Sequence, residues 1–143
     1  MKKLFKILFI FMTAFILCGC EKNISKLSYT TYNEYFSNKV GYIIMDNTSR
    51  YDLDVKRYLE AGDGNIQIFY IEFDSEKSAD KYLKDYYSSK EYKIKKYDTY
   101  TYIKSSKNGY LKLYKTENLI VMGTSIEKKY KRNVNRVLKD LGY

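Results

Sequence analysis

Few residues in this chain have the chemistry of a catalyst. Histidine, the side chain that most often moves protons near neutral pH, is absent. The S-x-x-K spacing of serine–lysine enzymes occurs twice, at Ser78–Lys81 and Ser125–Lys128. With so many serines and lysines, about two such pairs arise by chance, and in place of a K-T-G element the chain offers only Lys115-Thr116-Glu117. The sequence therefore predicts that the protein is not an enzyme.

Oxygen ligands for calcium are present, but their spacing does not fit a known loop. Aspartates cluster within residues 46–54, and Asp63 begins the turn Asp-Gly-Asn. An EF-hand loop needs Gly at position 6 and Glu at position 12, whereas counting from Asp63 gives Ile68 and Asp74. Glycine-rich phosphate loops and C-x-x-C and H-E-x-x-H motifs are missing as well. We expect no metal and no cofactor, and we assign these aspartates to caps and turns.

Both cysteines lie at the end of a segment typical of protein export. A basic start at residues 2–6, with three lysines, precedes an unbroken apolar run at residues 7–17. Eleven residues are too few for the roughly 20 that a helix needs to span a bilayer, so the run matches the core of a signal peptide.

This apolar run closes with Leu17-Cys18-Gly19-Cys20, which resembles the lipobox of bacterial lipoprotein signal peptides. The resemblance implies that a diacylglyceryl group is attached to Cys20 and that cleavage follows Gly19. It also implies that the protein is held on the extracytoplasmic face of the cell membrane. We therefore divide the chain into a signal peptide (1–19), a lipidated tether (20–27) and a single domain (28–143), whose body has no thiol for a disulfide.

The body has the alternating patterns of an α+β fold. Apolar residues at three- and four-residue intervals predict helices, and residues 66–73, apolar on both faces, predict a central strand. We expect helices at 28–40, 54–61, 76–87 and between Thr124 and Gly142, and strands at 42–45, 66–73, 92–104, 109–116 and 119–124. These elements predict an antiparallel sheet of about four or five strands with helices on one face. Helix–strand units recur at 28–45 and 76–94, which suggests a ferredoxin-like arrangement.

The net charge of the chain indicates which kinds of partner it could attract. The chain carries a formal net charge of +9, and lysines and arginines cover the outer side of the last helix. Such a surface can attract anionic lipid headgroups or an anionic polymer of the cell envelope, or it can serve solubility alone. Export argues against nucleic acid as a partner.

Several short segments resemble small uncharacterised lipoproteins of Firmicutes. They are Gly41-Tyr42, Asp46-x-Thr48, Phe73-Asp74, Ala79 in its helix, Asn118-Leu119-Ile120 and Leu141-Gly142-Tyr143. The resemblance covers nearly the whole exported body and implies its architecture and location. It implies no particular activity.

Our leading hypothesis is a non-enzymatic envelope lipoprotein that binds a protein, peptide or other envelope component through its sheet or sheet edge. A second hypothesis is a small-ligand carrier in which Tyr97, Tyr100 and Tyr102 line a groove beside Asp98. Strand alternation places Tyr100 and Tyr102 on one face and Tyr97 on the other, unless a bulge intervenes. An immunity-type lipoprotein fits the size and location equally well.

Overall fold

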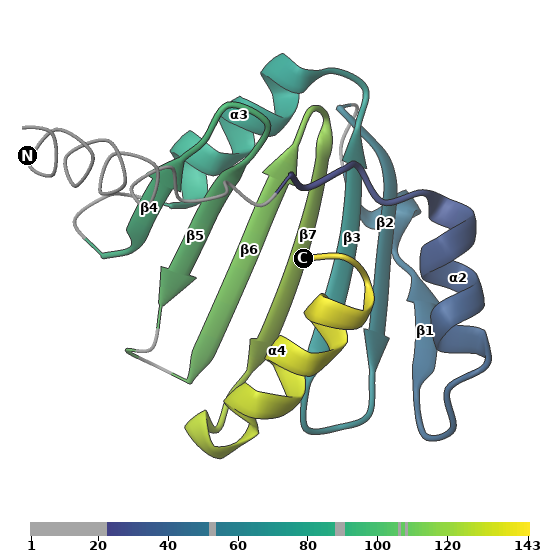
Figure 1. The fold of residues 1–143 in the computed structure, drawn as a ribbon. Helices are drawn as coiled ribbons and strands as arrows, with labels where there is room; N and C mark the ends of the chain where they lie inside the picture. The colour runs from purple at the N-terminus through teal and green to yellow at the C-terminus, as the bar shows by residue number, and fades with distance from the viewer. Residues whose placement is uncertain (1–22, 52–53, 88–90, 106, 108) are drawn as a thin grey trace, which may run out of the picture.

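The structure is a computed structural model that describes residues 23–51, 54–87, 91–105, 107 and 109–143. These residues form an α+β fold with an antiparallel seven-stranded sheet in the order β1-β2-β3-β7-β6-β5-β4 (Figure 1). The helices are α2 (Tyr29–Ser37), α3 (Glu76–Tyr86) and α4 (Lys131–Asp140). The strands are β1 (Ile43–Asp46), β2 (Val55–Gly62), β3 (Gln67–Phe73), β4 (Lys93–Lys96), β5 (Thr101–Ser105), β6 (Tyr110–Thr116) and β7 (Leu119–Ser125).

Strand β7 divides the sheet into two antiparallel meanders, β3-β2-β1 on one side and β6-β5-β4 on the other. Each meander has a helix before its edge strand, α2 before β1 and α3 before β4. The two helix–strand units expected from the sequence are therefore present. Because each unit leads into a meander of neighbouring strands, the topology does not show the ferredoxin-like arrangement.

Helices cover both faces of the sheet, so the expectation of helices on one face is wrong. We call the face under α2 and α4 the front face and the face under α3 the back face (Figure 1). Strand β3 shows why helices pack on both faces of the sheet. Its residues Ile68 and Tyr70 belong to the front core, whereas Ile71 and Phe73 belong to the back core. A strand that is apolar on both sides must be shielded from water on both sides.

Two expected elements are wrong, and their correction raises the strand count from four or five to seven. Of residues 54–61, expected as a helix, all but Asp54 lie in β2, where pairing with β1 and β3 outweighs the local helical pattern. Residues 92–104, expected as one strand, form β4 and β5. A tight turn joins them, in which the Tyr97 N–H donates to the Tyr100 carbonyl at 2.9 Å.

Other elements follow the sequence closely. Strand β3 is central, as expected from residues 66–73, and Ser75 caps α3 by accepting from the Ser78 N–H at 3.1 Å. The predicted ends of the helices are less accurate than their positions in the chain. Val40 is fully exposed because α2 ends at Ser37, and Ile126 is 92 % exposed because α4 begins only at Lys131.

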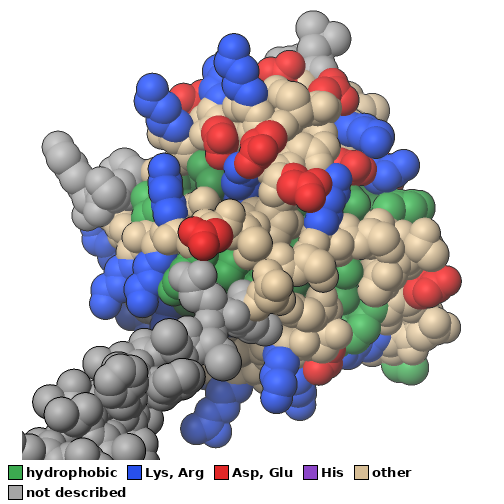
Figure 2. All heavy atoms as spheres, turned by 45° about the horizontal axis from the view of Figure 1, so that its top comes forward, with side chains coloured by type: hydrophobic (Ala, Val, Ile, Leu, Met, Phe, Trp, Pro, Cys, Tyr) green, Lys and Arg blue, Asp and Glu red, His purple; other side chains and the backbone are tan. Residues whose placement is uncertain are grey.

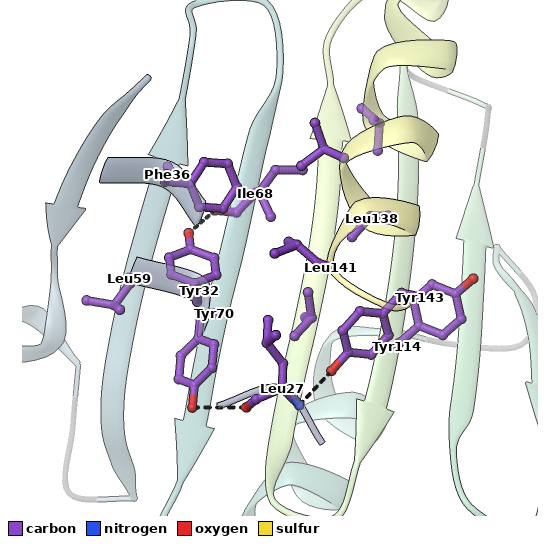
Figure 3. Close-up of a cluster of buried hydrophobic side chains, with 14 of the residues drawn as sticks. Leu27, Tyr32, Phe36, Leu59, Ile68, Tyr70, Tyr114, Leu138, Leu141 and Tyr143 are labelled. Atoms are coloured by element: carbon purple, nitrogen blue, oxygen red, sulfur yellow. Dashed lines mark hydrogen bonds between the residues drawn. The ribbon is translucent and has the colours of Figure 1, made fainter. Parts of the chain in front are cut away.

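The chain from Ile24 to Leu27 lies on the front core, which moves the start of the domain upstream of the expected residue 28. Ile24 and Leu27 are buried, and Leu27 lies between two tyrosines (Figure 3). The Tyr70 hydroxyl donates to the Leu27 carbonyl at 3.5 Å, and the Leu27 N–H donates to the Tyr143 hydroxyl at 3.3 Å. We call residues 24–27 the strap. Of the expected tether 20–27, residues 20–22 lie outside the described residues.

Gly123 allows α4 to approach β7 closely. A Cβ at this position would lie 2.5 Å from Val134 Cγ1 and 3.1 Å from both Ile68 Cδ1 and Leu138 Cδ1. Gly123→Ala should therefore overpack the front core and lower the free energy of unfolding by about 1–3 kcal/mol in urea denaturation. A second change, Val134→Ala, removes the closest atom, so the double variant should be less destabilised than the sum of the single variants. Strict additivity would contradict this account of the contact.

Candidate functional site

A wide cleft lies on the back face, beside α3. It has a volume of about 670 Å³, within the range typical of ligand sites. Its lining comes from α3, from the end of β3 and from the chain that enters β2: Tyr51, Asp54, Val55, Phe73, Ser78, Lys81, Tyr82, Asp85 and Tyr86. We call this the α3 cleft. It was not expected from the sequence, because residues 54–61 were assigned to a helix.

Aromatic rings form much of the α3 cleft. Tyr51 stacks on Tyr58 with ring centroids 4.0 Å apart and 10° between the planes, and Tyr82 lies against Tyr86 at 4.7 Å. Tyr51 is 45 % exposed and Tyr86 is 67 % exposed, so parts of both side chains meet water. Burial raises the pKa of Tyr58 and of Tyr82, so both phenols remain neutral to a higher pH than an exposed tyrosine.

Polar side chains of both kinds also line the α3 cleft. Asp54 and Asp85 supply carboxylate acceptors, and Lys81 supplies an ammonium donor. Ser78, the serine of one S-x-x-K motif, shares a hydrogen bond at 2.9 Å with the Ser75 hydroxyl at the start of α3, a capping role. No group of three or more His, Cys, Asp or Glu placed to hold a metal occurs among the described residues. The cleft thus combines ring surfaces with hydrogen-bonding groups.

A buried lysine fixes α3, and with it one wall of the cleft, on the sheet. Lys115 of β6 has a 7 % exposed side chain and binds Glu76 at 2.7 Å and Asp80 at 2.8 Å. Burial acts to lower the pKa of Lys115, but the hydrogen bonds and charges of Asp80 and Glu76 outweigh it and raise the pKa. Figure 2 views this end of the molecule, where Asp and Glu side chains gather among Lys and Arg.

A second candidate surface lies on the front face of β4, β5 and β6. Cross-strand register places Lys93 opposite Lys104 and Lys104 opposite Lys112, and in the next row it places Lys95 opposite Tyr102 and Tyr102 opposite Tyr114. The Lys112 ammonium also lies 5.2 Å from the Tyr114 ring centroid. We call this surface, formed by Lys93, Lys95, Lys104, Lys112, Tyr102 and Tyr114, the lysine–tyrosine face.

Like charges directly opposite one another destabilise a sheet, so the row of three lysines needs an explanation. Lysines on an edge strand discourage edge-to-edge aggregation, which accounts for β4. It does not account for Lys104 and Lys112, because β5 and β6 are interior strands. Residues 87–143 contain 14 basic and 5 acidic residues, whereas residues 23–86 contain 8 basic and 11 acidic ones. Positive charge is therefore concentrated in the half of the chain that forms this face.

The three tyrosines expected to line a groove are brought together, against the alternation argument. The turn before β5 stacks Tyr97 on Tyr100 at 4.5 Å, and Tyr102 packs on Tyr114 at 5.1 Å. Tyr100 and Tyr102 are partly buried against the front core and do not line the α3 cleft. Burial first, and then the phenols of Tyr110, Tyr97 and Tyr100, raise the pKa of Tyr102 to about 12.

The remaining expected site residues, Leu17, Cys18, Gly19 and Cys20, lie outside the described residues. None of the helices described for this chain is long and apolar enough to cross a membrane. No family model, curated protein or solved structure matches the chain. The candidate surfaces must therefore be judged by their own chemistry.

Alkaline pH should weaken the fold through its half-buried phenols. The pKa of Tyr42, Tyr70 and Tyr102 is raised from 10.0 to about 12 in each case, chiefly by burial. Between pH 10 and 12 the unfolded chain loses these protons while the folded chain keeps them, so the free energy of unfolding should fall as pH rises. Urea midpoints measured across this window test the prediction, and Tyr102→Phe should flatten the decline. A midpoint that does not change across the window would refute it.

Replacement of Lys104, the central lysine of the row, should show how much the like charges destabilise the sheet. Lys104→Glu converts two like-charge pairs into two opposite-charge pairs, so it should raise the free energy of unfolding by roughly 0.5 kcal/mol at low salt. Lys96→Glu, on the same sheet but opposite Thr101, is the matched control and should have little effect. Equal effects of the two substitutions in urea denaturation would count against a specific cost of the row.

Proposed function

We propose that this protein is a lipoprotein anchored to the extracytoplasmic face of the cell membrane through Cys20. In this proposal its body is a non-enzymatic binding module. The lipobox supports the anchor, and the lack of histidine supports a role other than catalysis. An anchored protein of this kind stays in the space next to the bilayer.

The ligand we propose for the α3 cleft is a carbohydrate chain of the cell envelope. The observation that carries this proposal is the combination of tyrosine rings and carboxylates in one open cleft of about 670 Å³. The C–H faces of a sugar ring pack on aromatic rings, and its hydroxyls donate hydrogen bonds to carboxylates. Tyr51, Tyr82 and Tyr86 supply the first kind of contact, and Asp54 and Asp85 supply the second.

The exposed ring of Tyr86 offers a direct test with little cost to the fold. Titration with a soluble N-acetylglucosamine oligosaccharide, followed by NMR or calorimetry, should give saturable binding. Tyr86→Ala should raise the Kd about fivefold, because it removes one stacking surface worth roughly 1 kcal/mol. The matched control is Tyr29→Ala, another exposed helix tyrosine that lies on α2 away from the cleft. Absence of binding, or an equal loss in both variants, would refute the carbohydrate proposal.

A further inference from the structure

We propose that the lipidated protein lies with its front face against an anionic membrane surface. In this orientation α4 and the lysine–tyrosine face meet the lipid headgroups, and the α3 cleft on the back face points away from the bilayer. The inference rests on the proposed lipid anchor at Cys20, and it goes further because it fixes which surface of the body meets the membrane.

The strap determines where the anchor leaves the body. Ile24 is buried in the front core, and the described chain begins in front of β6 and crosses the sheet to α2 (Figure 1). Lys26 adds a hydrogen bond to Asn118 and an ion pair with Glu72 at 3.8 Å. Only four residue steps separate Cys20 from Ile24, a reach of at most about 14 Å when fully extended. The acyl chains must therefore enter the bilayer close to the front face.

Charge favours the same orientation. Arg132, Arg136 and Lys139 are exposed on the side of α4 opposite its buried stripe of Val134, Val137 and Leu138. The lysine–tyrosine face continues this positive surface onto the sheet, where Lys131 of α4 lies 5.8 Å from the Tyr110 ring centroid. Each cation close to an anionic leaflet strengthens binding about fivefold.

The back face lacks this excess of positive charge. Helix α3 carries Glu76, Asp80 and Asp85 together with Lys77, Lys81 and Lys84, so its charges balance. A face of balanced charge gains little attraction from an anionic leaflet. A free anionic polymer could also bind the front face, but the short tether keeps the bilayer at a high effective concentration, so the membrane is the occupant we propose.

Two helix lysines provide a matched pair of reporter positions. Lys139 lies in the last turn of α4 on the front side, and Lys84 lies in the last turn of α3 on the back side; both are exposed. Because the only cysteines are Cys18 and Cys20, the lipidated protein has no free thiol to compete for a label. Full-length Lys139→Cys and Lys84→Cys variants are purified in lipidated form, labelled with a fluorophore and reconstituted in vesicles that carry a headgroup quencher. One set contains phosphatidylglycerol and the other only phosphatidylcholine.

We expect the label at position 139 to be quenched at least threefold more strongly than the label at position 84 in phosphatidylglycerol vesicles. The difference should shrink in phosphatidylcholine vesicles and at high salt, because both remove the attraction between the surface and the cations. Equal quenching at the two positions, or quenching at position 139 that does not depend on lipid charge, would overturn the proposed orientation.

Flotation of the same vesicles and mass spectrometry of the N-terminus separate the two proposals. Protein that carries no lipid on Cys20, or does not float, would overturn the anchor and with it the orientation. Protein that floats but shows equal quenching overturns the orientation alone. Arg132→Gln with Arg136→Gln should reduce quenching at position 139, whereas Lys77→Gln with Lys84→Gln on α3 should leave it unchanged. If soluble anionic polymer abolishes the quenching while flotation persists, the polymer is the preferred occupant and the membrane proposal fails.

Discussion

The arrangement of this protein depends on how Leu27 is held between Tyr70 and Tyr143. These hydrogen bonds join the start of the described chain to the central strand β3 and to the last residue of the chain. Tyr143 in turn packs on Tyr114 at 5.1 Å, and Tyr114 packs on Tyr102. A continuous series of aromatic contacts therefore runs from the strap to the lysine–tyrosine face. Because the strap belongs to the core, the place where an anchor would leave the body is fixed relative to the charged surfaces.

The sheet separates two surfaces with different chemistry. Its front face carries the strap, α4 and the lysine rows, and its back face carries α3 and the aromatic cleft. Lys115 extends from β6 to the carboxylates of α3 and holds that helix on the back face. A protein with a basic face for the membrane and a cleft on the other side could hold a ligand while it stays on the bilayer.

Much of this fold could be predicted from the sequence, namely the helices and strands that a local pattern of apolar residues determines. The two-sided apolar run of β3 and the three- and four-residue apolar spacing of α3 and α4 all lie in residues close together in the chain. The predictions of secondary structure were wrong where strand partners distant in the sequence determine the structure. Residues 54–61 have a local helical pattern, but β1 and β3 pair on either side of β2 and determine its structure. The turn between Tyr97 and Tyr100 likewise precedes a strand, β5, that pairs with β6.

The candidate surfaces could not be predicted from the sequence for the same reason. The α3 cleft joins Tyr51 and Asp54 to Tyr82 and Asp85, about 30 residues later in the chain, and no local spacing relates them. The lysine row requires the register of three strands, in which Lys93, Lys104 and Lys112 become neighbours only after two turns have formed. Opposed lysines weaken a sheet, so the row represents a cost in stability. The same positive charge is complementary to the anionic surface in the orientation that we propose.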